Sequence, residues 1–165
     1  MKKSQVWVLD VFFAFLVFVA VLVIFFKAET NLSEGDEQVF DDILFESRLV
    51  TDSLLSTGFP RDWDPTDVSE IGIAGNYRIN ETKLSNLQSM AYTSTKSKLR
   101  TRYDYYLFFE SSDGIMRIDS QEGIGKPGVN STNIVEEASP HNLVSAYRFV
   151  VFRSKPAKMV LYLWD

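Results

Sequence analysis

The feature that most constrains this chain is an apolar run of 21 residues, Val6 to Phe26, in which Asp10 is the only ionisable residue. A helix of this length spans about 31 Å, which matches the hydrocarbon thickness of a bilayer. The sequence therefore predicts one membrane-spanning helix. A cleaved secretory signal peptide is the alternative. However, the apolar run exceeds the roughly 7 to 15 residues usual for such peptides, and no small-x-small cleavage site follows it.

The charges on either side of the apolar run predict its orientation. Two lysines, Lys2 and Lys3, precede the run, and four acidic residues follow Lys27: Glu29, Glu34, Asp36 and Glu37. Cytoplasmic flanks of membrane helices are enriched in Lys and Arg. We therefore expect the N-terminus in the cytoplasm and everything after about residue 28 outside the membrane.

The charge balance restricts the partners of this outer region. The whole chain has 17 basic and 22 acidic residues, a net charge of −5. Three lysines and Asp10 belong to the apolar run and its flanks, so the region from residue 28 onward keeps 14 basic and 21 acidic residues, a net charge of −7. Nucleic acid is not expected as a partner, because phosphate binding requires clustered Lys and Arg. The absence of cysteine excludes disulfides and thiolate metal sites, and no cofactor is predicted.

Asp10 is unusual in an apolar helix. A carboxylate inside a membrane span costs a few kcal/mol unless it is protonated or paired, so it is a functional candidate. Two interpretations remain open. Asp10 lies four residues inside the span and could reach the cytoplasmic interface beside Lys2 or Lys3. Alternatively, it pairs with a positive group on the helix of a neighbouring subunit.

The basic stub Lys2-Lys3-Ser4, followed by Gln5 and an apolar helix with one acid near its start, resembles the class III signal peptide of archaeal type IV pilins. The resemblance implies that a dedicated peptidase cuts between Ser4 and Gln5 and leaves the helix on the mature subunit. It implies that Asp10 neutralises the new N-terminal amine of an adjacent subunit. It also implies assembly through the apolar helix, for which the candidate residues besides Asp10 are Phe12, Phe13, Phe15, Leu16 and Phe18.

A second helical pattern follows over residues 34–57. The apolar residues Val39, Ile43, Val50 and Leu54 recur at helical spacing, which indicates one buried face. Ser33 is a candidate N-cap after a polar break at residues 28–35, and Gly58 and Pro60 end the pattern. This segment either extends the membrane helix as a stalk or folds back on the outer domain. A long helix half embedded in its own domain is the arrangement that the pilin resemblance implies.

The rest of the chain predicts an α+β head domain with an antiparallel sheet. Asn80 caps a helix over about residues 82–99, and strands are expected at 104–110 and 115–119 around an Asp113-Gly114 turn. A polar loop covers 120–142, and a second hairpin pairs 146–152 with 159–164. The predicted organisation is a stub at 1–4, a helix at 5–57 that spans the membrane at about 6–26 and is amphipathic at about 34–57, and an extracellular head at 58–165.

Two kinds of binding or modification site are candidates in the outer region. Asp62, Asp64 and Asp67 resemble the front of a calcium loop, although ordinary Asx turns before a strand are the alternative, and no other metal site is predicted. Three Asn-x-Ser/Thr sequons make Asn31, Asn80 and Asn130 candidate acceptors for N-linked glycans. Asn130 lies in the polar loop and is the best placed of the three.

Catalytic motifs are absent from the sequence. The single histidine, His141, has Ser139 and Ser145 nearby, but no G-x-S-x-G, P-loop or G-x-G-x-x-G occurs. We therefore expect a protein that is not an enzyme. The pilin resemblance implies a structural subunit of a type IV pilus-like filament at the cell surface, held in the membrane before it assembles with copies of itself, and adhesion as a role. The alternative is a permanently membrane-anchored accessory or binding protein of the stator-like or surface-layer-contacting kind.

Overall fold

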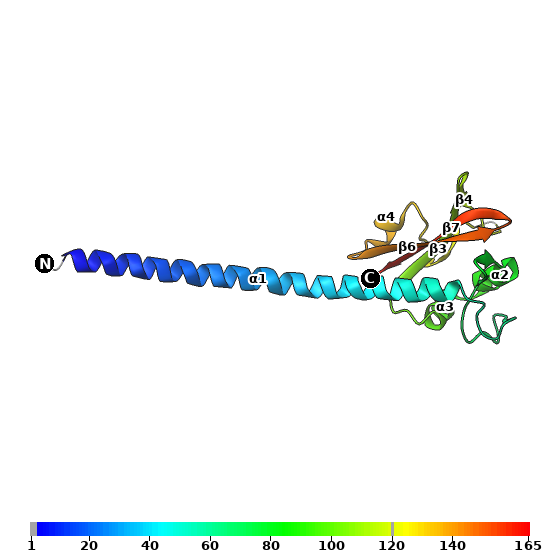
Figure 1. Ribbon diagram of the computed structural model, residues 1–165, viewed down its shortest axis with the longest axis horizontal. Coiled ribbons are helices and arrows are strands. Elements are labelled where there is room, and N and C mark those ends of the chain that lie inside the picture. The colour runs from blue at the N-terminus through cyan, green and yellow to red at the C-terminus, as the bar shows by residue number, and fades with distance from the viewer. Residues whose placement is uncertain (1–2, 120) are drawn as a thin grey trace. The chain divides into compact units, whose positions relative to one another are not determined.

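The computed structural model describes residues 3–119 and 121–165, and the side chains of residues 3–8 and 28–37 lie outside the description. The chain divides into two compact units, Met1–Val39 and Phe40–Asp165. We treat each unit by itself and refer to the second as the head unit. The overall class is α+β, as predicted (Figure 1).

One helix, α1 (Lys3–Leu54), covers the whole N-terminal region without interruption. The predicted polar break at residues 28–35 is therefore wrong, and Ser33 lies inside the helix instead of capping a second one. Segment 28–38 contains one glycine and no proline, and several of its residues are good helix formers. A single interior glycine costs only about 1 kcal/mol relative to alanine, which is not enough to end a helix.

Seven strands of the head unit form one sheet in the order β1-β2-β6-β7-β3-β4, with β5 pairing with β3. The strands are β1 (Ala74–Gly75), β2 (Arg78–Ile79), β3 (Asp104–Ser111), β4 (Gly114–Met116), β5 (Gly123–Gly125), β6 (Leu143–Phe152) and β7 (Lys155–Trp164). Both predicted hairpins are confirmed: β3 pairs with β4, and β6 with β7. The β2–β6 pair is parallel, and the other pairs are antiparallel.

The helices of the head unit differ from the prediction in two places. The expected helix at 82–99 is two helices, α2 (Glu81–Ser89) and α3 (Tyr92–Lys98), because Met90 and Ala91 adopt extended backbone between them. The expected loop at 120–142 contains β5 and a short helix, α4 (Ile134–Ala138). Gly125 permits the β3–β5 pairing, since a Cβ there would lie 2.2 Å from the carbonyl oxygen of Tyr105. The predicted N-cap is confirmed: the Asn80 side chain accepts from the Lys83 amide at 3.2 Å.

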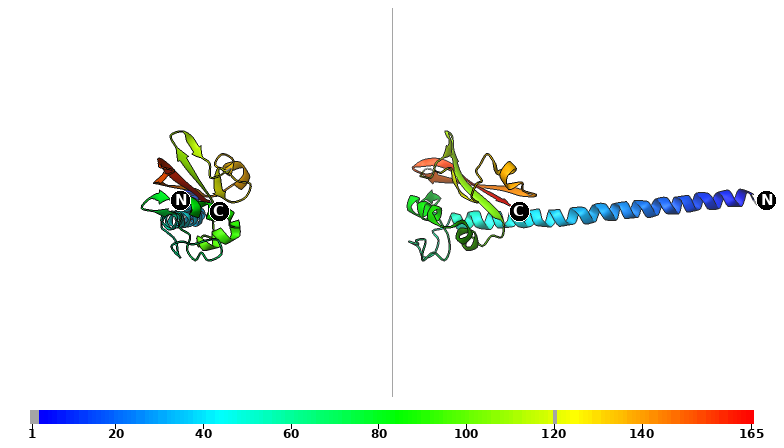
Figure 2. Two further views of the ribbon diagram at one scale, coloured as in Figure 1. Left: turned by 90° about the vertical axis from the view of Figure 1, so that its right-hand side faces the viewer. Right: turned by 180° about the vertical axis from the view of Figure 1, so that it is seen from behind.

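The sheet is covered on both faces. On one face, Tyr106, Phe108, Val160 and Trp164 pack in a cluster with Val129 and with Ile134 of α4. On the other face lies the C-terminal part of α1, as Figures 1 and 2 show for the head unit. Its residues Ile43, Ser47, Val50, Thr51 and Leu54 are buried. The last turns of α1 are thus part of the core of the head.

Candidate functional site

The apolar segment of α1 is the first candidate site. Within the described residues, one helix is long and apolar enough to cross a membrane: Leu9–Lys27, 19 residues with a mean hydropathy of 3.0. The predicted assembly residues all lie in it and are well exposed, at 59% for Phe12, 60% for Phe13, 64% for Phe15, 50% for Leu16 and 60% for Phe18. By length and composition the segment suits a membrane anchor or a signal sequence. Most of its described side chains are exposed.

Asp10 lies one residue inside this segment and is exposed. Among the residues whose side chains the structure describes, no ion pair involves Asp10. The predicted partner on another copy stays a prediction. The cleavage positions Ser4 and Gln5 lie in the first turns of α1, but their side chains are outside the described part, as is that of Asn31, and Lys2 lies outside it entirely.

The Asn130 sequon adopts a tight turn. The side-chain oxygen of Asn130 accepts hydrogen bonds from the Thr132 amide at 2.9 Å, the Thr132 hydroxyl at 2.8 Å and the Asn133 amide at 2.9 Å. All three bonds use the oxygen, whereas an N-linked glycan attaches to the nitrogen. Asn80 likewise accepts through its side-chain oxygen, from the Lys83 amide, when it caps α2. Asn80 is exposed and Asn130 is half-buried, and both glycan positions stay predictions.

The aspartates at 62–67 form turns instead of converging on a cation. Asp64 accepts from the Thr66 hydroxyl at 2.6 Å and the Thr66 amide at 2.7 Å, while Asp67 accepts from the Asp64 amide at 2.7 Å. The hydrogen bonds from Thr66 lower the pKa of Asp64. In the described part of the chain, no three His, Cys, Asp or Glu side chains are placed to hold a metal ion. The segment has the Asx-turn arrangement that was the alternative to a calcium loop.

A charged cluster around Asp104 was not predicted from the sequence. Asp104 accepts hydrogen bonds from Lys126 at 2.6 Å, from Lys96 at 2.7 Å and from the Tyr92 hydroxyl at 2.8 Å. Partial burial alone would raise the pKa of Asp104, but these three hydrogen bonds outweigh it and lower the pKa to about 2. Burial is the main cause that raises the pKa of Tyr92, and the hydrogen bond to Asp104 is the second. The cluster joins α3, β3 and the segment after β5, so its role is to hold these elements together.

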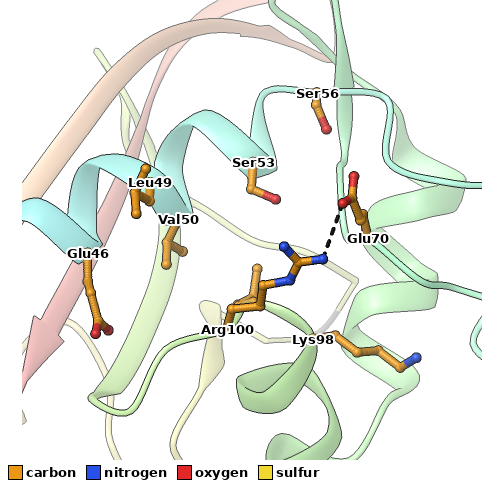
Figure 3. Close-up of a pocket in the computed structure, with 9 residues that line it drawn as sticks. Glu46, Leu49, Val50, Ser53, Ser56, Glu70, Lys98 and Arg100 are labelled. Carbon is orange, nitrogen blue, oxygen red and sulfur yellow. Dashed lines mark hydrogen bonds and ion pairs between the residues drawn. The ribbon is translucent and has the colours of Figure 1, made fainter.

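A hollow of about 350 Å³ opens beside the end of α1 (Figure 3). Its charged side chains are Glu46, Glu70, Lys98 and Arg100, and each already binds a protein partner. Glu46 accepts from the Thr101 hydroxyl at 2.7 Å, Arg100 pairs with Glu70 at 3.3 Å, and Lys98 donates to the Val68 carbonyl. A pocket whose charges are internally paired offers little to a charged ligand. This hollow is therefore a joint between the end of α1 and the α3 region.

The single histidine is not part of a catalytic arrangement that the structure describes. His141 is exposed, and no hydrogen bond joins it to a serine within residues 3–119 and 121–165. Ser139 donates to the Glu136 carbonyl at 3.3 Å. The geometry here offers no activated nucleophile.

Comparisons with protein-family models, curated proteins and solved structures gave no match.

Proposed function

We propose that this chain is a structural subunit of an extracellular type IV pilus-like filament. In this proposal the apolar segments of α1 pack together in the filament core, and the head units form its surface. The observation that carries the proposal is the continuity of α1. One unbroken helix contains the apolar segment Leu9–Lys27 and also supplies buried residues of the head, such as Ile43 and Leu54.

The C-terminal end of α1 is part of the head unit. Several contacts fix the helix end in the head. Asp52 pairs with Arg148 of β6 at 3.1 Å, Ser53 donates to the Ile71 carbonyl at 2.9 Å, and the Ile73 amide donates to the Leu54 carbonyl at 2.9 Å.

The energetics of transfer also support the proposal. The exposed aromatic and aliphatic side chains of Leu9–Lys27 need an apolar environment, which either lipid or other copies of the helix supplies. Exchange of lipid for helix contacts preserves most apolar burial. Asp10 would gain a positive partner only in the assembled state, which would favour assembly over the dispersed membrane form.

The test is to determine the N-terminus and the assembly state of the chain together. Mass spectrometry of the protein from cells should give a mature chain that begins at Gln5, and electron microscopy of the cell surface should show filaments that contain it. An intact N-terminal stub in membranes without any filaments would contradict the proposal. That result would instead support a permanently anchored accessory or binding protein.

A further inference from the structure

The longest open edge of the sheet belongs to β6. All ten residues of β6 pair with β7 on one side, whereas on the other side β6 pairs with β2 at Val151 alone. The other strands at the margins of the described sheet, β1, β4 and β5, have only two or three residues each. Residues 143–150 therefore have no partner strand on one side within the described part of the chain.

One hydrogen bond shows which backbone groups point to this open edge. The Val151 amide donates to the Tyr77 carbonyl at 2.8 Å, so the backbone N–H and C=O of Val151 point away from β7. In an antiparallel strand the backbone groups of alternate residues point to the same edge. Those of Ser145, Tyr147 and Phe149 therefore also point to the open edge. A row of backbone groups without a partner strand is a template on which another strand can pair.

The composition of β6 makes strand addition at this edge favourable. Residues 143–152 read LVSAYRFVVF, which is rich in β-branched and aromatic residues and contains neither proline nor glycine. Segments with high β propensity and little charge are those that add strand to strand in aggregates. Tyr147 and Phe149 are 56% and 75% exposed, so the surface beside the edge is partly apolar. Arg148 is the only charged residue of the strand.

The guanidinium group of Arg148 is bonded at the middle of the open edge. Its Nη1 donates to the Tyr147 carbonyl at 3.1 Å, and that carbonyl is one of the groups that point to the edge. Its Nη2 pairs with Asp52 of α1 at 3.1 Å, and the Arg148 side chain is 32% exposed. The guanidinium group thus takes the place that a donor from an added strand would need.

We propose that Arg148, held by Asp52, closes the open edge of β6 against pairing with a second copy of this chain. Because the Tyr147 carbonyl is already bound, an incoming strand has to displace the guanidinium group and break its pair with Asp52. That displacement removes two hydrogen bonds of a charged donor, which are stronger than those between neutral groups. The inference concerns the head unit alone and does not depend on the proposed filament.

A second cation beside the edge acts in the same direction. A hollow of about 360 Å³ is bordered by Ser145 and Arg148 of β6 and by Leu44, Ser47 and Arg48 of α1. Arg48 is exposed, and no ion pair involves it among the described residues. Two identical edges that pair about a two-fold axis would bring the Arg48 side chains of both copies toward each other. Like charges that approach in this way oppose the contact.

Removal of Arg148 tests the inference in the full-length chain dispersed in detergent. Sedimentation velocity measures how many copies of the chain travel together as the protein concentration rises. We expect Arg148→Ala to shift from single copies to dimers or larger species over a range in which the original chain stays single. Asp52→Asn should shift less, because Arg148 then loses its partner but keeps its charge. Absence of any association in Arg148→Ala would overturn the inference.

Two matched variants separate edge pairing from a general loss of charge. Arg153 also pairs with an acid, Glu81 at 3.0 Å, but lies in the turn after β6, so Arg153→Ala should stay a single copy. Arg148→Ala/Ser145→Lys places a new charge on the same strand and should return to single copies, because lysine on an edge strand opposes strand addition. Association of Arg153→Ala, or association that persists in the double variant, would overturn the inference.

Amide hydrogen exchange identifies the surface through which copies associate. In the dispersed original chain the amides of Tyr147 and Phe149 should exchange faster than those of Arg148 and Val150, whose backbone groups face β7. In associated Arg148→Ala the amides of Tyr147 and Phe149 should slow by about tenfold or more. Slow exchange at these two residues in the original chain would show that the edge is already covered and would contradict the inference. Association of Arg148→Ala without that slowing would place the contact elsewhere and would also contradict it.

Discussion

Lys126 donates a 2.6 Å hydrogen bond to the carboxylate of Asp104, and Lys96 donates a second to the other oxygen of the same group at 2.7 Å. Asp104 stands at the start of β3, so the two lysines connect the first residue of a central strand to α3 and to the segment that follows β5. The side chains of Lys96 and Asp104 are each about a quarter exposed. This partial shielding from water strengthens the pairs relative to ion pairs on an open surface.

The Asp104 pairs predict a loss of stability in acid. The folded-state pKa of Asp104 is lowered from 3.8 to about 2. A carboxylate with a lowered pKa stabilises the fold above its unfolded pKa and loses that contribution as the pH falls through the folded value, here between about pH 4 and pH 2. We expect on the order of 1 kcal/mol after allowance for solvent screening. This contribution is measured by denaturant unfolding in detergent as a function of pH, for the original full chain and for the Asp104→Asn variant. Equal slopes against pH in the two proteins would contradict the assignment.

A second prediction concerns Lys83, whose ammonium group is buried inside the head. Lys83 is 7% exposed and donates to the Thr57 carbonyl at 2.5 Å and the Arg61 carbonyl at 2.6 Å. Burial lowers its pKa. Lys83→Met keeps the apolar stem but leaves both carbonyls without this donor. A buried carbonyl that loses its hydrogen bond costs about 1 to 3 kcal/mol of stability.

The expected effect of Lys83→Met is a loss of about 2 to 6 kcal/mol in the free energy of unfolding, the sum for the two carbonyls. The matched control is Lys155→Met, because Lys155 is 66% exposed and its pair with Asp113 is long, at 3.7 Å. The control should change stability by less than about 0.5 kcal/mol. Equal effects of the two substitutions would show that water replaces the Lys83 contacts without penalty.

Elements with a strong local pattern were predictable from the sequence. The strands around 146–152 and 159–164 were placed correctly, although the structure extends them to 143–152 and 155–164 because the turn needs only Arg153 and Ser154. Both turn residues have positive φ, at 51° and 62°, which two-residue hairpins of this kind require. The sequence prediction, which left 153–158 outside the strands, therefore made the loop too long.

The elements that the sequence did not predict depend on distant contacts. β5 has three residues and two glycines, and it forms only because β3 offers an unpaired edge. In the Asp104 cluster, the bond from Lys126 to Asp104 alone joins residues 22 positions apart. Trp63 lies among residues for which the sequence predicts turns, yet it is only 2% exposed, and its indole donates to the Gly72 carbonyl at 2.8 Å. No local periodicity marks such residues.

A third prediction concerns the close packing at Gly72. A Cβ at this position would lie 2.3 Å from the Gly58 amide nitrogen and 2.5 Å from the Ser56 carbonyl oxygen, so backbone would have to move. We expect Gly72→Ala to lower the free energy of unfolding by about 2 to 4 kcal/mol, since overpacking against backbone cannot relax through a rotamer change. Gly75→Ala is the control, because its nearest neighbour would be 3.7 Å away. A shift in melting temperature confined to Gly72→Ala would confirm this.

A fourth prediction tests whether the end of α1 belongs to the core of the head. Leu54 is fully buried, whereas Leu49 on the same helix is 52% exposed. Leu54→Ala should reduce stability by about 2 to 5 kcal/mol because it leaves a cavity between helix and sheet. Leu49→Ala has the same change in helix propensity but should alter the stability of the dispersed protein by less than about 0.5 kcal/mol. Similar losses of stability in the two variants would contradict the assignment of Leu54 to the core of the head.

The last prediction concerns the acid in the apolar segment. If Asp10 pairs with an amine on a neighbouring copy, Asp10→Ala should reduce the yield of filaments strongly while the near-UV circular dichroism of the head stays unchanged. Removal of the charge should not impair membrane insertion, because an unpaired carboxylate in lipid is unfavourable by a few kcal/mol and alanine is not. Asp10→Glu keeps the negative charge and should restore assembly in part.

The outcome distinguishes the two interpretations of Asp10. An acid that only reaches the cytoplasmic interface beside Lys2 or Lys3 would be dispensable for assembly, and the alanine and glutamate variants would then give the same filament yield as the original chain. Filament mass per cell, measured by shearing and quantitative blotting, decides between them. Loss of filaments in the alanine variant with equal membrane content would assign the acid to the contact between copies.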